Sequence, residues 1–336
     1  MDEIGKVDRE VLARTVYDRV GASRTDVALG PGHGLDFGVV TVGDNAVAMA
    51  ADPVFVPLSL GVDRAAWYAV HIVLSDVALS GLAPTHLAVT ITLPAGADLD
   101  TFERVWTRFH EAAATEDVAI ATGHTGRYEG CAYPYIGGAT AMAVGDPEDL
   151  IVPSGASPGD AVLVTQGPAV ETVGVLATRF GDRLTVDEAT VAAAKDRFWE
   201  IGVVDDARVA ASTGAVTAMH DATERGIDNA LHELAAAADV ELVVERAAFP
   251  VGDGVEAVCS ALDIDPWTAS SEGTVVLTVA EDDVEAVLDA FAAADIRAAR
   301  VGSVQAGAGV RVDGDPMPEP ESDPFWVAYT RLADGE

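Results

Sequence analysis

The sequence predicts a protein of two domains, with an α+β layer in the first half and an α/β arrangement in the second. Three observations support this prediction. The chain has 336 residues, which is enough for two domains of ordinary size. Residues 38–145 follow the order β-β-α-β-α-β, and their strands alternate between apolar and polar residues, which is typical of a sheet with one buried face. A turn rich in Pro, Ser and Gly at residues 153–160 then precedes a new apolar strand and marks a domain junction.

The clearest helix of the first half covers residues 64–81. Its apolar residues recur at helical spacing, and Gly81 and Pro84 follow at its end. Two strands, at about 38–42 and 46–51, precede it and are joined by a Gly-Asp-Asn turn. The other elements expected here are an amphipathic helix at 8–20, a glycine-rich turn at 30–38, a strand at 85–96, an amphipathic helix at 98–117, and strands at 117–126 and 133–145.

In the second half, apolar strands and helical patterns alternate. The expected strands lie at 161–167, 215–221, 240–245, 273–280 and 298–305, and the expected helices at 169–180, 187–212, 226–238, 253–262 and 281–294. We expect residues 311–336 to be irregular. The resulting division is a first domain at 1–152, a second at 153–312 and an acidic, Pro-rich tail at 313–336.

Acidic residues dominate the charge of the chain. There are 55 acidic and 20 basic residues, which gives a net charge of -35. A field of this sign repels nucleic acid and anionic lipid surfaces, so neither is an expected partner. Only two basic residues are lysines, Lys6 and Lys195. We interpret this composition as adaptation to high salt, which shortens the Debye length to about 3 Å at 1 M and screens the self-repulsion. The protein is therefore expected to be halophilic.

Cysteine usage and the N-terminal sequence limit the class of protein further. Cys131 and Cys259 lie far apart, and no CxxC or Cys/His metal spacing exists, so zinc and redox motifs are not supported. The start, MDEIGKVDRE, is polar and acidic, unlike a signal peptide. No apolar run approaches the roughly 20 residues that span a bilayer. We expect a cytoplasmic protein.

One carboxylate stands out because Asp76 lies in the middle of the apolar helix at 64–81. A buried carboxylate without a partner is costly, so Asp76 would need a cation, a metal ion or backbone donors. The alternative is that Asp76 lies on the solvated face of the helix. The helix by itself leaves both interpretations open.

Several other acidic or imidazole side chains follow apolar segments. They are Asp36 after the glycine turn, Asp52 after a strand, His124 after a short strand and Asp221 after another strand. Each of them is also compatible with a surface turn, where Asp is common. Together with Asp76 they fit a hard cation such as Mg²⁺, which takes carboxylates and substrate phosphates as ligands. The glycine turn could bring backbone N–H groups close to a phosphate.

Other catalytic motifs are not supported. The glycine turn is neither a Walker sequence nor a dinucleotide-binding fingerprint, so phosphates would have to be neutralised by metal ions, backbone amides and an Arg such as Arg225. No G-x-S-x-G elbow is present. Local or packing roles are expected for four histidines, His33, His71, His86 and His220.

These residues resemble the family of aminoimidazole ribonucleotide synthetase, which includes the hydrogenase maturation factor HypE, selenophosphate synthetase and thiamine-monophosphate kinase. Residues 74–84, LSDVALSGLAP, resemble the signature (N/S)D-x-A-x-x-G-A-x-P, and residues 220–226, HDATERG, resemble the HypE-type turn DPT-R-GG. The remaining matches are 36–38, Asp52 with the Pro57-Leu58 pair, 123–125, 153–160 and the Ser-Glu-Gly at 271–273. The resemblance extends over nearly the whole chain.

The resemblance implies a PurM-like fold, with a ferredoxin-like N-terminal domain and an α/β C-terminal domain of six or seven strands. It also implies a homodimer whose N-terminal sheets form a barrel, and ATP bound with Mg²⁺ between the domains. By the same resemblance, Asp36, Asp52, Asp76 and Asp221 are the metal candidates. The glycines Gly30, Gly32 and Gly34 would let the backbone approach phosphate, and His124 and Thr125 would meet the transferring phosphoryl group.

The sequence departs from the HypE pattern at three places. Ser75 replaces the usual Asn, as in thiamine-monophosphate kinase, and His124 replaces the usual Asp, as in selenophosphate synthetase. The sequence ends in LADGE without the terminal Cys that carries the HypE substrate group. The glycine turn also has no Cys or Lys of the selenophosphate synthetase type.

We therefore expect a Mg²⁺-dependent, ATP-using enzyme that phosphorylates an oxygen atom of an unidentified small molecule or protein. The alternatives are a small-molecule kinase and a nucleotide-binding partner protein without turnover.

Overall fold

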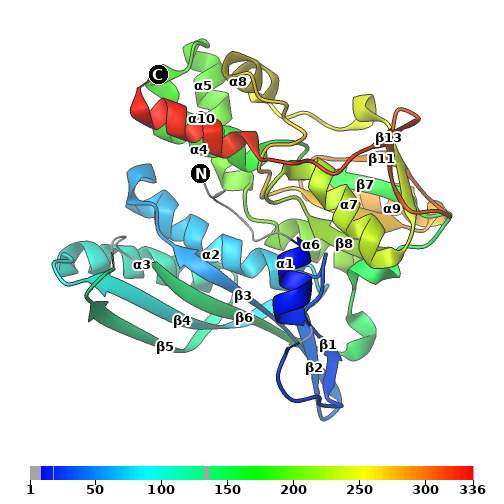
Figure 1. The fold of residues 1–336 in the computed structure, drawn as a ribbon, viewed down its shortest axis with the longest axis horizontal. Coiled ribbons are helices and arrows are strands. Elements are labelled where there is room, and N and C mark those ends of the chain that lie inside the picture. The colour runs from blue at the N-terminus through cyan, green and yellow to red at the C-terminus, as the bar shows by residue number, and fades with distance from the viewer. Residues whose placement is uncertain (1–8, 18, 132–135, 336) are drawn as a thin grey trace. The chain divides into compact units, whose positions relative to one another are not determined.

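The computed structural model describes residues 9–17, 19–131 and 136–335 (Figure 1). Backbone packing separates two compact units. The N-terminal unit consists of Asp26–Gly30 and Asp36–Leu150. The C-terminal unit consists of the described residues up to Thr25, the short segment Pro31–Leu35 and the described residues from Ile151 onward. Half of the glycine-rich turn thus packs with the C-terminal unit, although it lies early in the sequence.

The N-terminal unit is built on a six-stranded mixed sheet in the order β1-β2-β3-β6-β4-β5. Its strands are β1 (Val27–Leu29), β2 (Gly38–Val42), β3 (Asn45–Phe55), β4 (Pro84–Pro94), β5 (Ala119–Tyr128) and β6 (Ile136–Gly145). Strands β4 and β5 are parallel and the other neighbours are antiparallel. A parallel pair needs a crossover, and helix α3 (Leu99–Thr115) supplies it between β4 and β5.

Helices α2 (Val62–Ala78) and α3 pack on one side of this sheet, as Figure 1 shows. Strand β3 explains the arrangement, because Ala46, Ala48 and Ala50 are buried while their neighbours Val47 and Met49 are only half-buried. Small residues on the covered face let α2 approach the backbone closely. The predicted layer of two helices on one face of a mixed sheet is confirmed.

The C-terminal unit has a seven-stranded sheet in the order β13-β12-β9-β11-β7-β10-β8. The strands are β7 (Ala161–Thr165), β8 (Val216–Asp221), β9 (Glu241–Val244), β10 (Val275–Val279), β11 (Ala298–Gln305), β12 (Gly309–Val312) and β13 (Asp315–Met317). The helices are α4 (Val170–Phe180), α5 (Glu188–Asp196), α6 (Val204–Ser212), α7 (Gly226–Ala238), α8 (Val255–Leu262), α9 (Val284–Ala293) and α10 (Pro324–Asp334). Every residue of β7 and β10 is buried, which is typical of strands covered on both faces.

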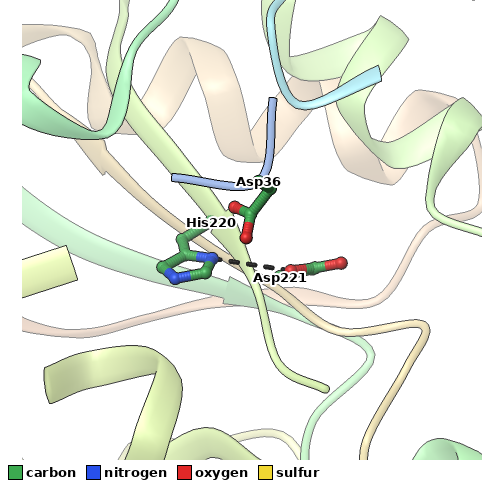
Figure 2. A group of neighbouring side chains, drawn as sticks. All are labelled: Asp36, His220 and Asp221. Atoms are coloured by element: carbon green, nitrogen blue, oxygen red, sulfur yellow. Dashed lines mark ion pairs between the residues drawn. The ribbon is translucent and has the colours of Figure 1, made fainter. Parts of the chain in front are cut away.

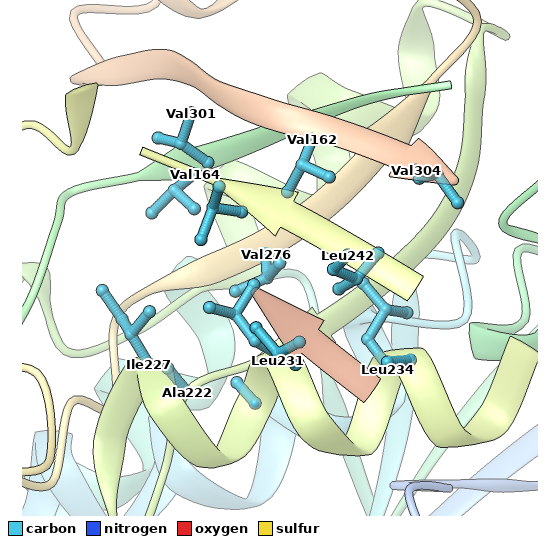
Figure 3. Packing of buried hydrophobic residues seen from close by; sticks show 14 of the residues in the cluster. Val162, Val164, Ala222, Ile227, Leu231, Leu234, Leu242, Val276, Val301 and Val304 are labelled. Atoms are coloured by element: carbon cyan, nitrogen blue, oxygen red, sulfur yellow. The ribbon is translucent and has the colours of Figure 1, made fainter. Parts of the chain in front are cut away.

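The core of this unit lies between α7 and the sheet (Figure 3). Helix α7 presents Ile227, Leu231 and Leu234, which lie on one face at helical spacing and are fully buried. They pack in one cluster with Val164 of β7 and Val276 of β10. Burying side chains of this size stabilises the fold by about 1.5–3 kcal/mol each. This packing fixes α7 against the sheet and therefore fixes the turn that joins β8 to α7.

Two secondary-structure predictions are wrong. The single helix expected at 187–212 is interrupted between α5 and α6 by a 3₁₀ turn at Arg197–Glu200 and by Gly202. Arg197 is only 2% exposed and donates a 3.0 Å hydrogen bond to the carbonyl oxygen of Gln166, so the chain turns inward there. The tail expected to be irregular at 311–336 instead contains β13 and α10, the latter capped by Asp323.

The expected N-terminal helix is shorter than predicted. Helix α1 (Arg9–Leu12) passes directly into a π-helical turn at Ala13–Tyr17. In the strand expected at 133–145, residues 133–135 lie outside the described residues, and β6 begins at Ile136. Among the described helices, none is long and apolar enough to cross a membrane.

Candidate functional site

The candidate site is centred on the carboxyl end of β8, the last strand in the order of the C-terminal sheet. β8 pairs with β10, and Asp221 lies opposite Val275. The last two residues of β8, His220 and Asp221, are both almost fully buried. Burial of a carboxylate at a strand end requires compensating groups around it.

The turn after Asp221 is tight. Arg225 and Gly226 both have a φ of 62°, in the left-handed region, and α7 begins at Gly226. A Cβ at Gly226 would lie 2.5 Å from the carbonyl oxygens of Trp267 and Ala269, so only glycine fits there. The turn is thereby held between β8 and the residues before β10.

His220 lies between two carboxylates. Its Nδ1 atom is 3.5 Å from Oδ1 of Asp221, the ion pair drawn in Figure 2, and its Nε2 atom is 3.2 Å from Oε2 of Glu233 on α7. The side chains of His220 and Asp221 are 2% exposed and that of Glu233 is 12% exposed. The ring therefore lies between Asp221 at the end of β8 and Glu233 on α7.

Asp36 belongs to the same group of side chains. It directly follows Pro31–Leu35, the segment that packs with the C-terminal unit. Ligand atoms of Asp36, His220 and Asp221 all lie within 4.8 Å of one another (Figure 2). Two carboxylates are the donors that Mg²⁺ prefers, and imidazole is a poorer ligand for it. Binding of a divalent cation by Asp36 and Asp221 stays a prediction.

The three glycines of the turn have different roles. Gly34 has a φ of 69°, and a Cβ there would lie 2.8 Å from the carbonyl oxygen of Glu233. This position needs glycine because the segment Pro31–Leu35 packs closely on α7. A Cβ at Gly32 would meet only the side chain of Leu35, and one at Gly30 would have ordinary contacts. Contact of the three glycines with phosphate stays a prediction.

Arg225, the predicted phosphate contact, lies four residues after Asp221. Its backbone N–H donates a 2.8 Å hydrogen bond to Oδ2 of Asp323, and its Nη1 donates to the carbonyl oxygen of Pro320 at 3.3 Å. The tail thus contacts both the backbone and the guanidinium group of Arg225. A phosphate contact of Arg225 stays a prediction.

The other two carboxylates predicted as metal ligands lie in the N-terminal unit. Asp52 on β3 is half-buried, and its Oδ2 atom is buried without a hydrogen-bond partner among the described residues. Asp76 on α2 is half-buried between the fully buried Ser75 and Val77. The hydroxyl of Ser75 donates to the carbonyl oxygen of His71 at 2.9 Å, so it is engaged within the helix.

The two residues predicted to be catalytic lie on β5, the last strand in the order of the N-terminal sheet. His124 and Thr125 are both exposed. The Nε2 atom of His124 is 2.6 Å from the hydroxyl oxygen of Tyr128. Their exposure leaves them accessible to a ligand, and their catalytic role stays a prediction.

Sequence reasoning missed two members of the strand-end group. His220 was expected to have a local or packing role, and Glu233 was not singled out. Glu233 lies seven residues after Gly226, two helical turns into α7, on the side that faces β8. Its spacing from the turn was the available signal. By contrast, His71 packs as expected, because its ring lies against that of Trp67 with the ring centroids 4.0 Å apart, and burial lowers its pKa to about 4.

A shallow hollow of about 590 Å³ lies on the N-terminal sheet. Four of its lining residues, Ala51, Ala88, Gly123 and Gly138, are small and come from β3, β4, β5 and β6. Small side chains in four neighbouring strands leave this depression.

Comparison with protein-family models identifies the family. Residues 34–145 match the N-terminal domain of AIR synthase related proteins, and residues 157–315 match the C-terminal domain. The chain belongs to the AIR synthase related family. The resemblance derived from the sequence motifs, and the PurM-like fold expected from it, are both confirmed.

Two relatives show the breadth of this family. The carbamoyl dehydratase HypE of Rhizobium leguminosarum bv. viciae is 31% identical over 241 residues, covering 71% of this chain and 67% of the relative. The thiamine-monophosphate kinase of Halobacterium salinarum is 32% identical over 290 residues, covering 82% of this chain and 90% of the relative.

Solved structures have the same fold. Escherichia coli HypE, a hydrogenase maturation protein, superposes with a TM-score of 0.67 and 26% identity, covering 83% of this chain and 87% of that one. A HypE solved in complex with ATP gives a TM-score of 0.67 at 23% identity, covering 96% of this chain and 97% of that one. At this identity the second likeness concerns the fold.

Proposed function

We propose that this protein binds ATP together with Mg²⁺ and transfers a phosphoryl group to an oxygen atom of a small molecule or a protein. The observation that carries this proposal is the group of Asp36, His220 and Asp221 at the end of β8. The names of the relatives support it, since one is a kinase and another is a carbamoyl dehydratase. Two proteins of this fold were solved with ATP or with AMPPCP.

In this proposal Asp36 and Asp221 hold the metal ion, with Asp52 and Asp76 as further ligands. The buried Oδ2 atom of Asp52, which has no hydrogen-bond partner among the described residues, supports a role in ligand binding. Mg²⁺ would supply neutralisation of the phosphate charge. In the same proposal His220, which lies between Asp221 and Glu233, helps to position the carboxylate of Asp221.

The remaining residues of the proposed site contact the nucleotide. Backbone N–H groups of Gly30, Gly32 and Gly34 approach the phosphates, and Arg225 adds a positive charge. His124 and Thr125 meet the transferring phosphoryl group. Phosphoryl transfer depends mainly on positioning and charge neutralisation, which these groups provide.

A small-molecule kinase is the second candidate function. It is favoured by the match to 90% of the length of the Halobacterium salinarum kinase and by Ser75, which replaces the Asn of the HypE pattern. Under this candidate the phosphoryl acceptor is a small phosphate ester, such as the substrate named in that relative.

The test is direct. Binding of ATP is measured by calorimetry with and without Mg²⁺ in molar KCl, because the net charge of -35 is expected to need high salt. We expect Mg²⁺-dependent binding, and ATP-dependent phosphorylation of thiamine monophosphate if the kinase candidate is right. Absence of ATP binding contradicts the proposal. Binding without turnover, with thiamine monophosphate or a metabolite pool, would instead indicate a nucleotide-binding partner protein.

We also propose that two copies of the chain associate through the N-terminal sheet. The exposed side chains of Phe55 and Val144 and the hollow lined by small residues support this proposal. A second copy would cover this apolar face. Sedimentation in molar KCl should give a dimer, and Ala88→Arg, which fills the hollow with a charge, should give a monomer. A wild-type monomer would contradict it.

A further inference from the structure

Asp323, in the tail, accepts hydrogen bonds from three different segments of the C-terminal unit. Its Oδ2 atom accepts the N–H of Arg225 at 2.8 Å and the hydroxyl of Ser270 at 2.6 Å. Its Oδ1 atom accepts the N–H of Phe325 at 2.9 Å and that of Ser270 at 3.3 Å. The bond to Phe325 caps helix α10, and the others reach residues 53 and 98 positions away. A helix cap needs only the bond from Phe325, so the bonds from Arg225 and Ser270 require another explanation.

These contacts converge on the turn that follows Asp221. The backbone N–H of Ala222 donates to the carbonyl oxygen of Thr274, and the N–H of Ser271 donates to that of Thr223. One side of the turn is therefore bonded to residues 271–274. On the other side, the N–H of Arg225 donates to Asp323.

The bond to Arg225 has a specific consequence. Arg225 has a left-handed backbone, which is strained for a residue other than glycine and persists only where the surrounding structure holds it in place. A hydrogen bond from its N–H to a carboxylate is charge-assisted and stronger than a neutral one. Asp323 therefore stabilises a strained turn that directly follows the carboxylate of Asp221.

We propose that Asp323 is a positioning residue for the metal–nucleotide site: through Arg225 it fixes the turn at 222–226, and thereby the carboxylate of Asp221. The inference rests on the function proposed above, and it adds Asp323, which lies 102 positions after Asp221, to the residues on which the proposed site depends. The guanidinium group of Arg225 also donates a hydrogen bond to the carbonyl oxygen of Pro320 in the tail. Asp323 itself need not contact the ligand.

The substitution Asp323→Asn separates the two roles of this side chain. Asn is a good helix N-cap, so its oxygen can retain the bond to the N–H of Phe325. Its NH₂ group then lies opposite the N–H of Arg225, and two donors cannot bond to each other. The variant keeps the cap of α10 and loses the bond to the turn.

Asp187→Asn is the matched control. Asp187 caps α5 in the same unit, and its side chain accepts from the backbone N–H and the hydroxyl of Thr190, both at 2.9 Å. The same chemical change there affects a cap without reaching the turn. Ser270→Ala is a second probe, because it removes the 2.6 Å bond that helps to hold Oδ2 of Asp323 against the N–H of Arg225.

The experiment measures ATP binding by calorimetry in molar KCl as a function of Mg²⁺ concentration, and thermal unfolding of each variant. In Asp323→Asn, the Mg²⁺ concentration needed for half-maximal ATP binding should rise about tenfold, the size expected for loss of one charge-assisted hydrogen bond. Ser270→Ala should raise it about threefold, and Asp187→Asn should change it less than twofold. We expect the melting temperature to fall equally in Asp323→Asn and Asp187→Asn. A difference in Mg²⁺ requirement between these two variants then reports positioning of the site and not loss of stability.

An unchanged Mg²⁺ requirement in Asp323→Asn, with ATP binding by the wild type intact, overturns this inference alone. An equal rise in Asp187→Asn overturns it as well. Failure of the wild type to bind ATP overturns the proposed function, and this inference with it. If Asp323→Asn does not fold, Ser270→Ala decides, since an unchanged requirement there overturns the proposal.

Discussion

The residues proposed to bind and transfer phosphate lie in two kinds of surroundings. His220 and Asp221 are buried at the end of β8, and His220 lies 3.2 Å from Glu233. His124 and Thr125 lie exposed on the last strand of the other sheet, where the Nε2 atom of His124 is 2.6 Å from the hydroxyl oxygen of Tyr128. Buried carboxylates at the end of a strand suit a metal ion, because a metal ion needs ligands in fixed positions. Exposed side chains suit a group that meets a substrate directly.

The largest effect is expected at the buried end of this comparison. Asp221→Asn removes a charged ligand and should weaken Mg²⁺-dependent ATP binding at least about 100-fold, roughly the worth of a buried charge-assisted contact. Calorimetry in molar KCl measures it, with Asp187→Asn as the control for losing one carboxylate from the same unit. Equal binding by Asp221→Asn and wild type would remove Asp221 from the site.

A smaller and different effect is expected on the exposed strand. His124→Ala should lower kcat by about 30-fold if the ring assists the transferring group, which is below the roughly 100- to 10,000-fold that positioned acids and bases contribute. The dissociation constant of ATP should change less than twofold, because the side chain of His124 is exposed and its loss removes no buried contact. Steady-state kinetics and calorimetry on the same variant separate the two quantities. Weakened ATP binding with unchanged kcat would reverse the roles assigned to the two regions.

The glycine turn provides a stability test that does not depend on a ligand. Gly34→Ala places a Cβ 2.8 Å from the carbonyl oxygen of Glu233 in a left-handed conformation, and should cost about 1–3 kcal/mol of unfolding free energy. Gly30→Ala is the matched control, because its Cβ would lie 3.8 Å from the nearest atom. Denaturant unfolding of both variants gives the difference. If both lose the same stability, close packing of the turn on α7 is not what requires Gly34.

The smallest effect concerns two buried titratable groups, one in each unit. Burial raises the pKa of Asp206 to about 7, and burial lowers the pKa of His71 to about 4. Between about pH 4 and 7 the folded state binds more protons at Asp206 than the unfolded state, so this group's contribution to stability falls as pH rises. At His71 the folded state binds fewer protons between about pH 4 and 6.5, so its contribution falls as pH drops.

Thermal unfolding of Asp206→Asn and His71→Gln between pH 4 and 8 tests these opposite signs. The melting temperature of Asp206→Asn should rise relative to that of the wild type as the pH approaches 8. That of His71→Gln should rise relative to the wild type as the pH approaches 4. Parallel pH profiles for wild type and both variants would show that neither group titrates differently on folding.

Most of the fold follows from local patterns. The helix at α7 was predicted with its observed bounds, because its apolar spacing is regular and a turn precedes it. The strand at β11 was likewise predicted at its observed bounds. The helix expected at 187–212 failed because the burial of Arg197, which bonds to Gln166, is not encoded in local periodicity. Helix α10 carried a signal, the Asp323-Pro324 pair typical of a helix start, which the Pro-rich composition obscured.

The sequence alone determined the family, through motifs spread along the chain. It also grouped Asp36, Asp52, Asp76 and Asp221 as metal candidates, which stays a prediction. Residue type and short-range spacing carry that information. Only the tertiary structure decided that His220 lies between Asp221 and Glu233, that close packing on α7 requires Gly34, and that Asp323 bonds to the turn 98 residues before it. These contacts join segments that are distant in sequence. Their geometry arises from the packing of whole elements, which no local pattern specifies.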